Sequence, residues 1–221
     1  MISIAIDGPS GAGKSTLARN IAARLGYIYV DTGALYRALG LKLKNKGVEV
    51  TDEKSVKDVL KTTNVRLEFK GGEQRVILDN EDVSDIIRTP EVSKAASQFS
   101  ALPAVRAHLL ELQRNMAKTD NIIMDGRDIG TVVLPNADIK IFLSASPEDR
   151  AKRRFDELIS KGQDVKYEDV LADMIKRDYD DTHREVSPLK KAEDATDFDT
   201  TGNTFEQSVE LLYNFIKSKG V

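Results

Sequence analysis

This chain has no cysteine and only two histidines among its 221 residues. The absence of cysteine excludes a disulfide framework and any cysteine-based zinc or redox site. The histidines, His108 and His183, lie far apart in the sequence, which disfavours a histidine-rich metal site. The chemistry of this protein must therefore come from other side chains.

Long apolar runs and an excess of basic residues are also missing. No apolar stretch is long enough to cross a bilayer. The first residues show no basic region ahead of an apolar segment, so we expect no secretory signal and a cytoplasmic protein. The 33 basic and 36 acidic residues give a net charge of −3, whereas proteins that bind nucleic acid usually carry a basic excess. We expect neither a nucleic acid nor a membrane partner.

Apolar segments of two kinds alternate along the chain and predict an α/β fold. Short apolar runs typical of buried strands stand between segments of helical periodicity, a pattern that favours one domain with a parallel sheet flanked by helices. We expect strands at residues 2–6, 27–30, 121–124, 139–143 and 195–199, and helices at residues 16–25, 34–46, 52–61, 167–184 and from residues 90, 103, 147 and 204 onward.

A small β region interrupts this pattern. Residues 65–69 alternate apolar and polar side chains, residues 70–73 form a glycine-containing turn signal, and residues 75–78 resemble a returning strand. This order predicts a hairpin. We assign residues 64–88, approximately, to an inserted subdomain.

A glycine-rich motif indicates phosphate binding. It fits G-x-x-x-x-G-K-[ST] and comprises Gly8, Pro9, Ser10, Gly11, Ala12, Gly13, Lys14 and Ser15. Backbone N–H groups of such a loop, together with the N-terminus of the helix that follows, surround phosphate oxygens. We expect Lys14 to reach the β- and γ-phosphates, Ser15 to bind Mg²⁺, and Thr16 to belong to the nucleotide-binding segment. The alternative is a structural glycine turn before a helix.

Two further motifs follow expected strands, where ligands of open α/β sheets bind. Residues 31–37, DTGALYR, place a hydroxyl and an arginine near a helix start, which suits a phosphate acceptor, although Thr32 acting only as a helix cap is the alternative. Residues 124–130, MDGRDIG, supply an acid that can hold Mg²⁺ through water, or else a turn with a local ion pair. The chain has no Asn-Lys-x-Asp guanine-reading motif and is short for a motor ATPase.

The motifs GPSGAGKST, DTGALYR, KAASQFSALPAVR, MDGRDIGTVV and RDYDDTHREVSPL, in this order, resemble the bacterial-type cytidylate kinases, which are P-loop nucleoside monophosphate kinases. The first motif also resembles guanylate kinases, but the later ones do not. The resemblance extends over nearly the whole chain. It implies a monomer that transfers the γ-phosphate of ATP to CMP or dCMP with Mg²⁺.

The resemblance also implies residue roles. Three arginines would hold the acceptor phosphate, namely Arg37, Arg127 and Arg184. Three residues would read the cytosine, namely Ser97, Arg106 and Asp128. Asp181 would bind the ribose and Tyr36 would pack beside the acceptor, while Thr32 stands where many relatives carry serine. The groups implied to act in catalysis are Lys14, Arg37, Arg127, Asp128 and Arg184.

A charged segment at about residues 150–177 is similar to the closing lid of these kinases. Its candidate phosphate contacts are Arg153 and Arg177, with Arg154 a third possibility. For Arg153 and Arg154 the alternative is an exposed charged helix face without a specific contact. We expect His183, Asp178 and Asp180 to be surface residues.

Two rival functions stay open at this point. One is a kinase for another small acceptor, such as guanylate, uridylate or shikimate. The other is a nucleotide-dependent switch or assembly protein, which would hydrolyse ATP in response to a macromolecule and release no phosphorylated small product. The arginine-rich acceptor motifs argue against the second. Phosphoryl transfer depends on positioning and charge stabilisation, so no nucleophilic side chain is expected.

Overall fold

The computed structural model describes residues 1–71 and 73–221 and has the expected α/β architecture. The chain forms two compact units. Unit 1 contains Met1–Tyr29 and Asp120–Val221, and unit 2 contains Val30–Thr119. The predicted hairpin turn includes Gly72, which lies outside the described residues.

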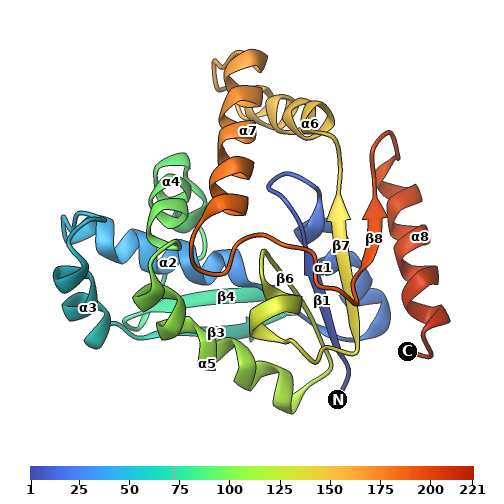
Figure 1. Cartoon of the computed structure of the whole chain (residues 1–221), viewed down its shortest axis with the longest axis horizontal. Coiled ribbons are helices and arrows are strands. Elements are labelled where there is room, and N and C mark those ends of the chain that lie inside the picture. Colours follow the sequence, from blue (N-terminus) through green and yellow to red (C-terminus); the bar gives the residue numbers. More distant parts are fainter. Residues whose placement is uncertain (72) are drawn as a thin grey trace. The chain divides into compact units, whose positions relative to one another are not determined.

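The main sheet has five strands in the order β2-β6-β1-β7-β8 (Figure 1). Its strands are β1 (Ser3–Asp7), β2 (Ile28–Asp31), β6 (Ile122–Gly126), β7 (Ile139–Ser144) and β8 (Thr196–Asp199). β1 pairs in parallel with β6 and β7, and β7 pairs in parallel with β8. Ile4, Ala5 and Ile6 of β1 are fully buried, as expected for a central parallel strand. The predicted parallel sheet is confirmed.

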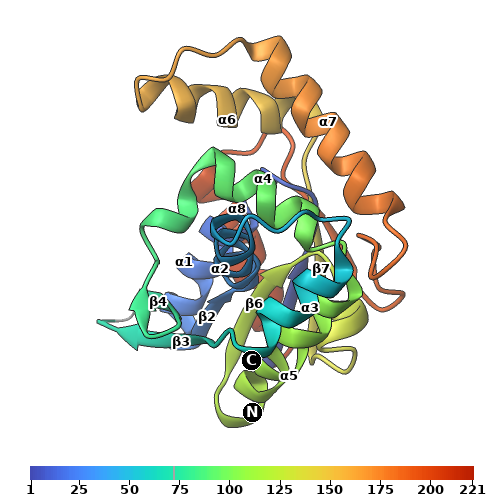
Figure 2. The ribbon, with the colours of Figure 1, turned by 90° about the vertical axis from the view of Figure 1, so that its left-hand side faces the viewer.

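Four helices belong to unit 1, namely α1 (Lys14–Leu25), α6 (Pro147–Ser160), α7 (Tyr167–His183) and α8 (Phe205–Ser218). Apolar side chains of α1 and α8 form one buried cluster with the strands. The start of α8 is fixed by a reciprocal pair, in which the Thr204 hydroxyl accepts from the Gln207 N–H and the Gln207 side chain accepts from the Thr204 N–H. Helices α6 and α7 pack against each other (Figure 2).

Unit 2 combines four α-helices, a short 3₁₀ turn and a small antiparallel sheet. The helices are α2 (Thr32–Asn45), α3 (Glu53–Lys61), α4 (Pro90–Phe99) and α5 (Pro103–Thr119), and the turn is Ile86–Arg88. The sheet contains β3 (Val65–Lys70), β4 (Glu73–Leu78) and β5 (Glu81–Asp82), so the predicted hairpin is present. Helices α2 and α4 approach so closely at Gly40 that a Cβ there would lie 2.7 Å from the Ala96 nitrogen.

Three local features differ from the sequence expectations. Helix α1 starts at Lys14, two residues earlier than expected, so Lys14 and Ser15 lie in its first turn. Helix α2 starts at Thr32, two residues earlier than expected, and Asp31 caps it by accepting from the Ala34 N–H, so the alternative of Thr32 as the cap is wrong. A π-helical turn at Ile129–Val133 was not expected at all. All three lie at motifs that the sequence predicts to bind phosphate, and functional sites are where local rules are most often broken.

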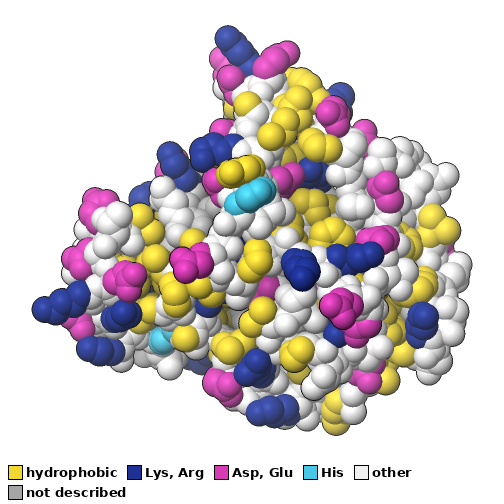
Figure 3. All heavy atoms as spheres, viewed as in Figure 1, with side chains coloured by type: hydrophobic (Ala, Val, Ile, Leu, Met, Phe, Trp, Pro, Cys, Tyr) yellow, Lys and Arg dark blue, Asp and Glu magenta, His cyan; other side chains and the backbone are white. Residues whose placement is uncertain are grey.

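The surface carries both signs of charge. On the face seen in Figure 3, acidic and basic side chains are interspersed among polar and apolar ones. This distribution agrees with 33 basic and 36 acidic residues in the chain. Among the described residues, no helix has the length and apolar character that crossing a membrane requires.

Candidate active site

The glycine-rich loop connects β1 to α1 and is built around backbone geometry that only glycine tolerates. Gly8 has a φ of 153°, and a Cβ there would lie 1.9 Å from the Leu143 carbonyl oxygen. Gly13, at the N-cap of α1, has a φ of 86°, which a residue with a Cβ rarely adopts. The first turn of α1 leaves backbone N–H groups without a partner inside the helix, and these can donate to an anion.

Lys14 is buried within this loop, with 5% of its surface exposed. Its ammonium donates a hydrogen bond to the Pro9 carbonyl at 2.7 Å. Burial and the positive charge of Arg127 lower the pKa of Lys14 to about 7, against the opposing effect of Asp125 and other carboxylates. Burial and the charge of Arg127 both disfavour the charged ammonium, so an anion bound close to Lys14 would stabilise its charged form.

Ser15 and Asp125 bring two oxygen ligands together. The Ser15 hydroxyl donates to one carboxylate oxygen of Asp125 at 2.8 Å, and the Tyr29 hydroxyl donates to the other at 2.9 Å. An oxygen-only donor set of this kind suits Mg²⁺, which usually keeps several waters and binds through one or two protein groups plus phosphate. Among the described residues, no group of three His, Cys, Asp or Glu side chains could hold a metal by itself.

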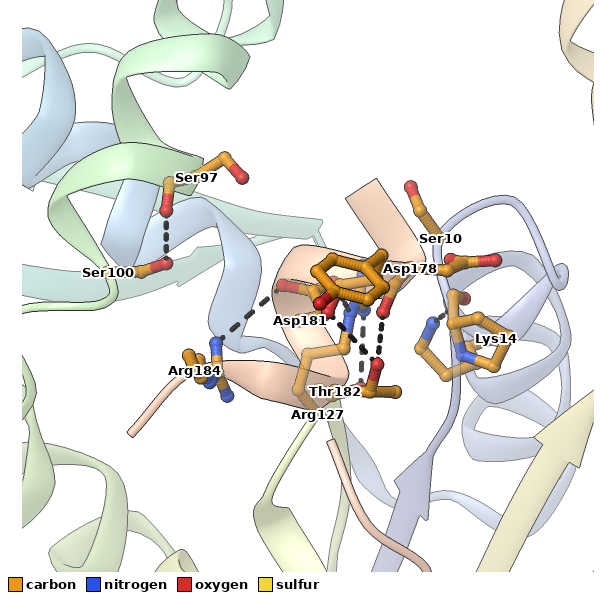
Figure 4. A network of polar contacts seen from close by, with 12 residues as sticks. Ser10, Lys14, Ser97, Ser100, Arg127, Asp178, Asp181, Thr182 and Arg184 are labelled. Atoms are coloured by element: carbon orange, nitrogen blue, oxygen red, sulfur yellow. Dashed lines mark hydrogen bonds and ion pairs between the residues drawn. The ribbon is translucent and has the colours of Figure 1, made fainter. Parts of the chain in front are cut away.

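A charged cluster at the end of β6 and the end of α7 joins three of the predicted site residues (Figure 4). The Asp181 carboxylate accepts from Arg127 Nε at 2.8 Å and lies 3.7 Å from Arg184 Nη1. Burial would raise the pKa of Asp181, but Arg127, Arg177 and Arg184 together lower it. The carboxylate therefore stays ionised and fixes two guanidinium groups whose remaining N–H donors suit a phosphate.

Asp128 follows Arg127 and precedes the π-helical turn. Its side chain is buried, with 3% of its surface exposed. Its backbone carbonyl accepts from the N–H groups of Val132 and Val133, which closes the turn.

Asp7 is a site residue that the sequence analysis did not identify. It ends β1 and is 4% exposed, and its two carboxylate oxygens accept from the backbone N–H groups of Ile129 and Gly130 at 2.8 and 2.7 Å. A Cβ on Gly130 would lie 3.3 Å from the Asp7 carboxylate. Asp7 thereby holds the turn that directly follows Arg127 and Asp128. A buried acid immediately before the glycine motif was the available signal.

The pKa of Asp7 leads to a prediction about stability. Burial raises this pKa to about 6, although the two backbone N–H donors and Lys14 oppose the increase. The folded protein thus holds the proton at pH values where the unfolded chain has lost it, so stability falls as pH rises through about 6. Relative to Asp7→Asn, we expect the wild type to lose roughly 1.4 kcal/mol of unfolding free energy between about pH 5 and about pH 7.5.

Urea unfolding of both proteins at the two pH values measures this difference. Asp138→Asn is the matched control, because Asp138 also accepts from a backbone N–H, that of Ser3, but is exposed and has a lowered pKa. A carboxyl group with a lowered pKa is fully ionised across this pH range. The difference in unfolding free energy between the wild type and Asp138→Asn should therefore be the same at both pH values. An equally constant difference for Asp7→Asn would contradict the assignment.

Arg150 is a second residue that the sequence analysis missed, and its partner corrects one expectation. Arg150 is buried, and its guanidinium donates to the carbonyls of Ala145 and Ser10 and to the Asp178 carboxylate at 2.6 Å. The expectation that Asp178 is a surface charge is therefore wrong. Asp178 helps to connect α7 through Arg150 to the glycine-rich loop.

The other charged residues of α6 and α7 differ in their surroundings. Arg153 donates to the Thr200 carbonyl at 3.2 Å, and its guanidinium would lie 4.0 Å from a Cβ on Gly13. Arg154 pairs with Glu157 at 2.7 Å on the surface. Arg177 is partly buried and contributes to the field on Asp181. Arg153 and Arg177 thus lie beside site residues of unit 1, whereas the described partner of Arg154 is a surface residue.

The other two residues of α7 that were expected at the surface, Asp180 and His183, are exposed as predicted. His183 is exposed and stacks on Tyr179 with ring centroids 3.9 Å apart, and Asp180 is exposed beside Lys176. Thr16, in the first turn of α1, is exposed as well.

In unit 2 the start of α2 positions one predicted arginine. The Asp31 carboxylate caps α2 and accepts from Arg37 Nη2 at 2.8 Å. A Cβ on Gly33 would lie 3.0 Å from Arg37 and 3.1 Å from Asp31, so glycine leaves room for this pair. Arg37 Nε is buried and has no hydrogen-bond partner in the described structure. Thr32 is almost fully buried at the same helix start.

The remaining candidates of unit 2 gather around Arg106. This buried residue donates to the Ser100 carbonyl at 3.1 Å, and its guanidinium carbon lies 5.2 Å from the centre of the Tyr36 ring. The Ser97 carbonyl accepts from the Ser100 hydroxyl. Tyr36, Ser97 and Arg106 therefore belong to one neighbourhood of unit 2.

A family model and two similar relatives point to one family. A family model described as cytidylate kinase matches residues 4–218. A cytidylate kinase of Caldicellulosiruptor bescii is 49% identical over 99% of this chain and 98% of the relative, and one of Carboxydothermus hydrogenoformans is 49% identical over 98% and 97%. A solved structure of an uncharacterized protein from Eubacterium ventriosum shares the fold, with a TM-score of 0.53, 14% identity and 98% coverage of both chains.

Proposed function

This chain belongs to the cytidylate kinase family, and from that premise we propose how its residues divide the work of the reaction. The reaction is the transfer of the γ-phosphate of ATP to CMP or dCMP, which gives ADP and CDP or dCDP. The protein is thus an ATP-dependent nucleoside monophosphate kinase.

One observation carries the residue assignment. Burial, together with the positive charge of Arg127, lowers the pKa of Lys14. Lys14 belongs to the glycine-rich motif, and Arg127 belongs to the motif at residues 124–130. Burial is the larger cause of this lowered pKa, and the charge of Arg127 adds to it, so an anion that contacts both groups would be stabilised by two positive charges. The phosphoryl group that moves from ATP to the acceptor is such an anion, and its charge during transfer is what these groups stabilise.

The ATP side of the proposed site consists of the glycine-rich loop, the Ser15 hydroxyl and the Asp125 carboxylate. Backbone N–H groups of the loop and of the first turn of α1 bind the ATP phosphates, and Lys14 exchanges its bond with the Pro9 carbonyl for a phosphate oxygen. Ser15 and Asp125, whose side chains already share a hydrogen bond, would hold Mg²⁺. The metal would supply positive charge that neutralises the phosphates during transfer.

The acceptor side uses arginines that acids already hold in place. Asp181 fixes Arg127 and Arg184, and Asp31 fixes Arg37. Guanidinium groups give bidentate, permanently charged contacts to a phosphate, so the three arginines orient the CMP phosphate as the attacking group. Asp181 binds the ribose through its free lone pairs. The cytosine and its surroundings are assigned to Thr32, Tyr36, Ser97, Arg106 and Asp128.

Residues 150–177 act as the lid. Arg153 and Arg177 approach the phosphates on closure, and water is excluded so that ATP is not hydrolysed. We also propose that residues 64–88, approximately, form an inserted subdomain that binds the acceptor. The protein is proposed to be a cytoplasmic monomer with no nucleic acid partner. No side chain is required as a nucleophile, because the acceptor phosphate itself attacks.

A panel of acceptors tests the proposed specificity. ADP release with ATP should be fast with CMP and dCMP, and slow with UMP, AMP and GMP. Asp128 can accept from the cytosine amino group but repels the uracil carbonyl, so Asp128→Ala should narrow the CMP-to-UMP ratio of kcat/KM by about tenfold or more.

The panel also separates the rival readings. If GMP, UMP or shikimate were phosphorylated faster than CMP, the proposed acceptor would be wrong. If a macromolecule stimulated ATP hydrolysis and no phosphorylated small product formed, the protein would be a switch or assembly protein and not a kinase. A mutant that retains the full preference for CMP would exclude Asp128 as the base-reading residue.

A further inference from the structure

Gln74 makes an unusual pair of hydrogen bonds with the end of β2. Its side-chain oxygen accepts from the Asp31 N–H at 2.9 Å, and its side-chain nitrogen donates to the Asp31 carbonyl at 3.3 Å. One amide side chain thus satisfies the donor and the acceptor of one residue, as a neighbouring strand does in a hydrogen-bonded pair. Gln74 lies on β4, far from Asp31 in sequence but within the same unit.

Asp31 is the residue on which the start of α2 depends. One oxygen of its carboxylate caps the helix at Ala34, at 3.0 Å, and the other binds Arg37 at 2.8 Å. The side chains of Asp31 and Arg37 are 14% and 22% exposed, so the ion pair is shielded from water on most sides. Any rotation of the Asp31 backbone would move the cap and the guanidinium together.

The arginine at the end of this chain of contacts still has a donor to offer. Arg37 Nε is buried and unpartnered within the described structure, whereas Nη2 is engaged by Asp31. An unsatisfied buried guanidinium N–H is costly unless a ligand accepts from it. Its direction is set by Asp31, and the Asp31 backbone is held by Gln74.

From this chain of contacts we infer that Gln74 is a positioning residue for the acceptor phosphate, acting through Asp31 on Arg37. The inference rests on the proposed role of Arg37 in binding the phosphate of CMP. It gives the inserted hairpin a task in the reaction, because the hairpin supplies the side chain that fixes the arginine. Gln74 itself needs no contact with the nucleotide.

The hairpin offers a matched control. Successive residues of a strand point to opposite faces. The next residue, Arg75, pairs with Asp82 and Asp85 of the same hairpin region at 2.8 and 3.0 Å. Arg75→Met therefore removes two ion pairs of the hairpin region and leaves the hydrogen bonds between Gln74 and Asp31 in place. It separates a general weakening of the hairpin from the specific loss of the Asp31 contact.

The test compares Gln74→Leu, Gln74→Glu, Arg37→Met and Arg75→Met in steady-state kinetics. Gln74→Leu removes both hydrogen bonds, so KM for CMP should rise about tenfold, while KM for ATP stays within about twofold. Gln74→Glu keeps the acceptor but loses the donor and adds a charge beside Asp31, so it should also raise KM for CMP. Arg75→Met should match the wild type in both constants.

Two further readouts distinguish positioning from a merely structural role. Cytidine lacks the phosphate, so its inhibition constant against CMP should be unchanged by Gln74→Leu. If Gln74 acts only through Arg37, the Gln74→Leu/Arg37→Met double variant should bind CMP no more weakly than Arg37→Met alone.

Each failure has a separate signature. Gln74→Leu with unchanged KM for CMP, while Arg37→Met raises it, overturns the inference and leaves the role of Arg37 intact. Equal losses for CMP and cytidine, or additive effects in the double variant, overturn it as well. An Arg37→Met protein with unchanged KM for CMP overturns the proposed role of Arg37 and the inference together.

Discussion

Replacing Lys14 by methionine should lower turnover by roughly 10²- to 10³-fold, the scale for removing one preorganised group that stabilises transition-state charge. Methionine fills a similar volume but carries no charge. Among the described residues, the ammonium donates to the Pro9 carbonyl of the glycine-rich loop at 2.7 Å. ADP release with saturating ATP and CMP measures the loss.

The same substitution should leave the folded state intact. Burial and Arg127 lower the pKa of Lys14 to about 7, so at neutral pH the folded protein carries the cost of a buried, partly charged amine. Removing the amine removes that cost and gives up only one hydrogen bond, worth about 1 kcal/mol. Thermal unfolding should therefore show a Tm at or near that of the wild type.

The combination of the two results is informative. Lost activity with retained stability is expected where a residue is kept for function at the expense of stability. Near-normal turnover would contradict the assignment of the glycine-rich loop to ATP. A large fall in Tm would show instead that Lys14 supports the fold, and the turnover value would then say little about charge stabilisation.

Structural features that depend on residues close together in the sequence were predictable from it. The glycine-rich loop is recognised from eight consecutive residues, and the hairpin of β3 and β4 from period-two alternation on both sides of a glycine turn. The start of α8 is indicated by the N-cap residue Thr204. Such signals depend on local backbone geometry and on hydrophobic periodicity. Their positions were found to within about two residues, which is the usual uncertainty of helix ends.

Features that depend on distant partners were not predictable. Asp7 is recognisable as a clamp only once β1 and the π-helical turn at Ile129–Val133 have been brought together. Asp178 reads as a surface charge until α6 places Arg150 opposite it. In each case a polar residue looks ordinary in its own segment, and only tertiary packing shows that it is buried and paired.

The family resemblance supplied what spacing could not, namely the identity of the acceptor. The geometry adds a physical reason for the arginines, since carboxylates hold both Arg127 and Arg37 before any phosphate arrives. A held arginine loses less conformational freedom on binding than a free one.

Arg127→Met should lower kcat/KM for CMP by roughly 10²- to 10³-fold, because truncating one partner of a shielded, hydrogen-bonded charge pair costs about 2–5 kcal/mol. Two losses combine in this variant. The acceptor phosphate loses a bidentate ligand, and Asp181 loses the 2.8 Å bond that orients it. Arg127→Lys should recover only a small part of the activity, since an ammonium cannot make two parallel bonds.

Steady-state kinetics with each nucleotide varied in turn measure this effect. Arg127 belongs to the acceptor motif, so KM for CMP should rise and kcat should fall, while KM for ATP changes little. Arg154→Met is the control, because Arg154 pairs with Glu157 on the surface of α6, and exposed pairs of this kind contribute about 0–1 kcal/mol. Its kinetic constants should equal those of the wild type.

The effect of Arg127→Met on Lys14 gives an independent check. Arg127 is one of the causes that lower the pKa of Lys14, together with burial. Removing the guanidinium should therefore raise the pKa of Lys14 and keep its ammonium protonated to a higher pH. An NMR titration of the labelled lysine in the two proteins without nucleotide tests this directly. An unchanged Lys14 pKa would mean that the two cations do not share one electrostatic site, and the common anion proposed for them would lose its basis.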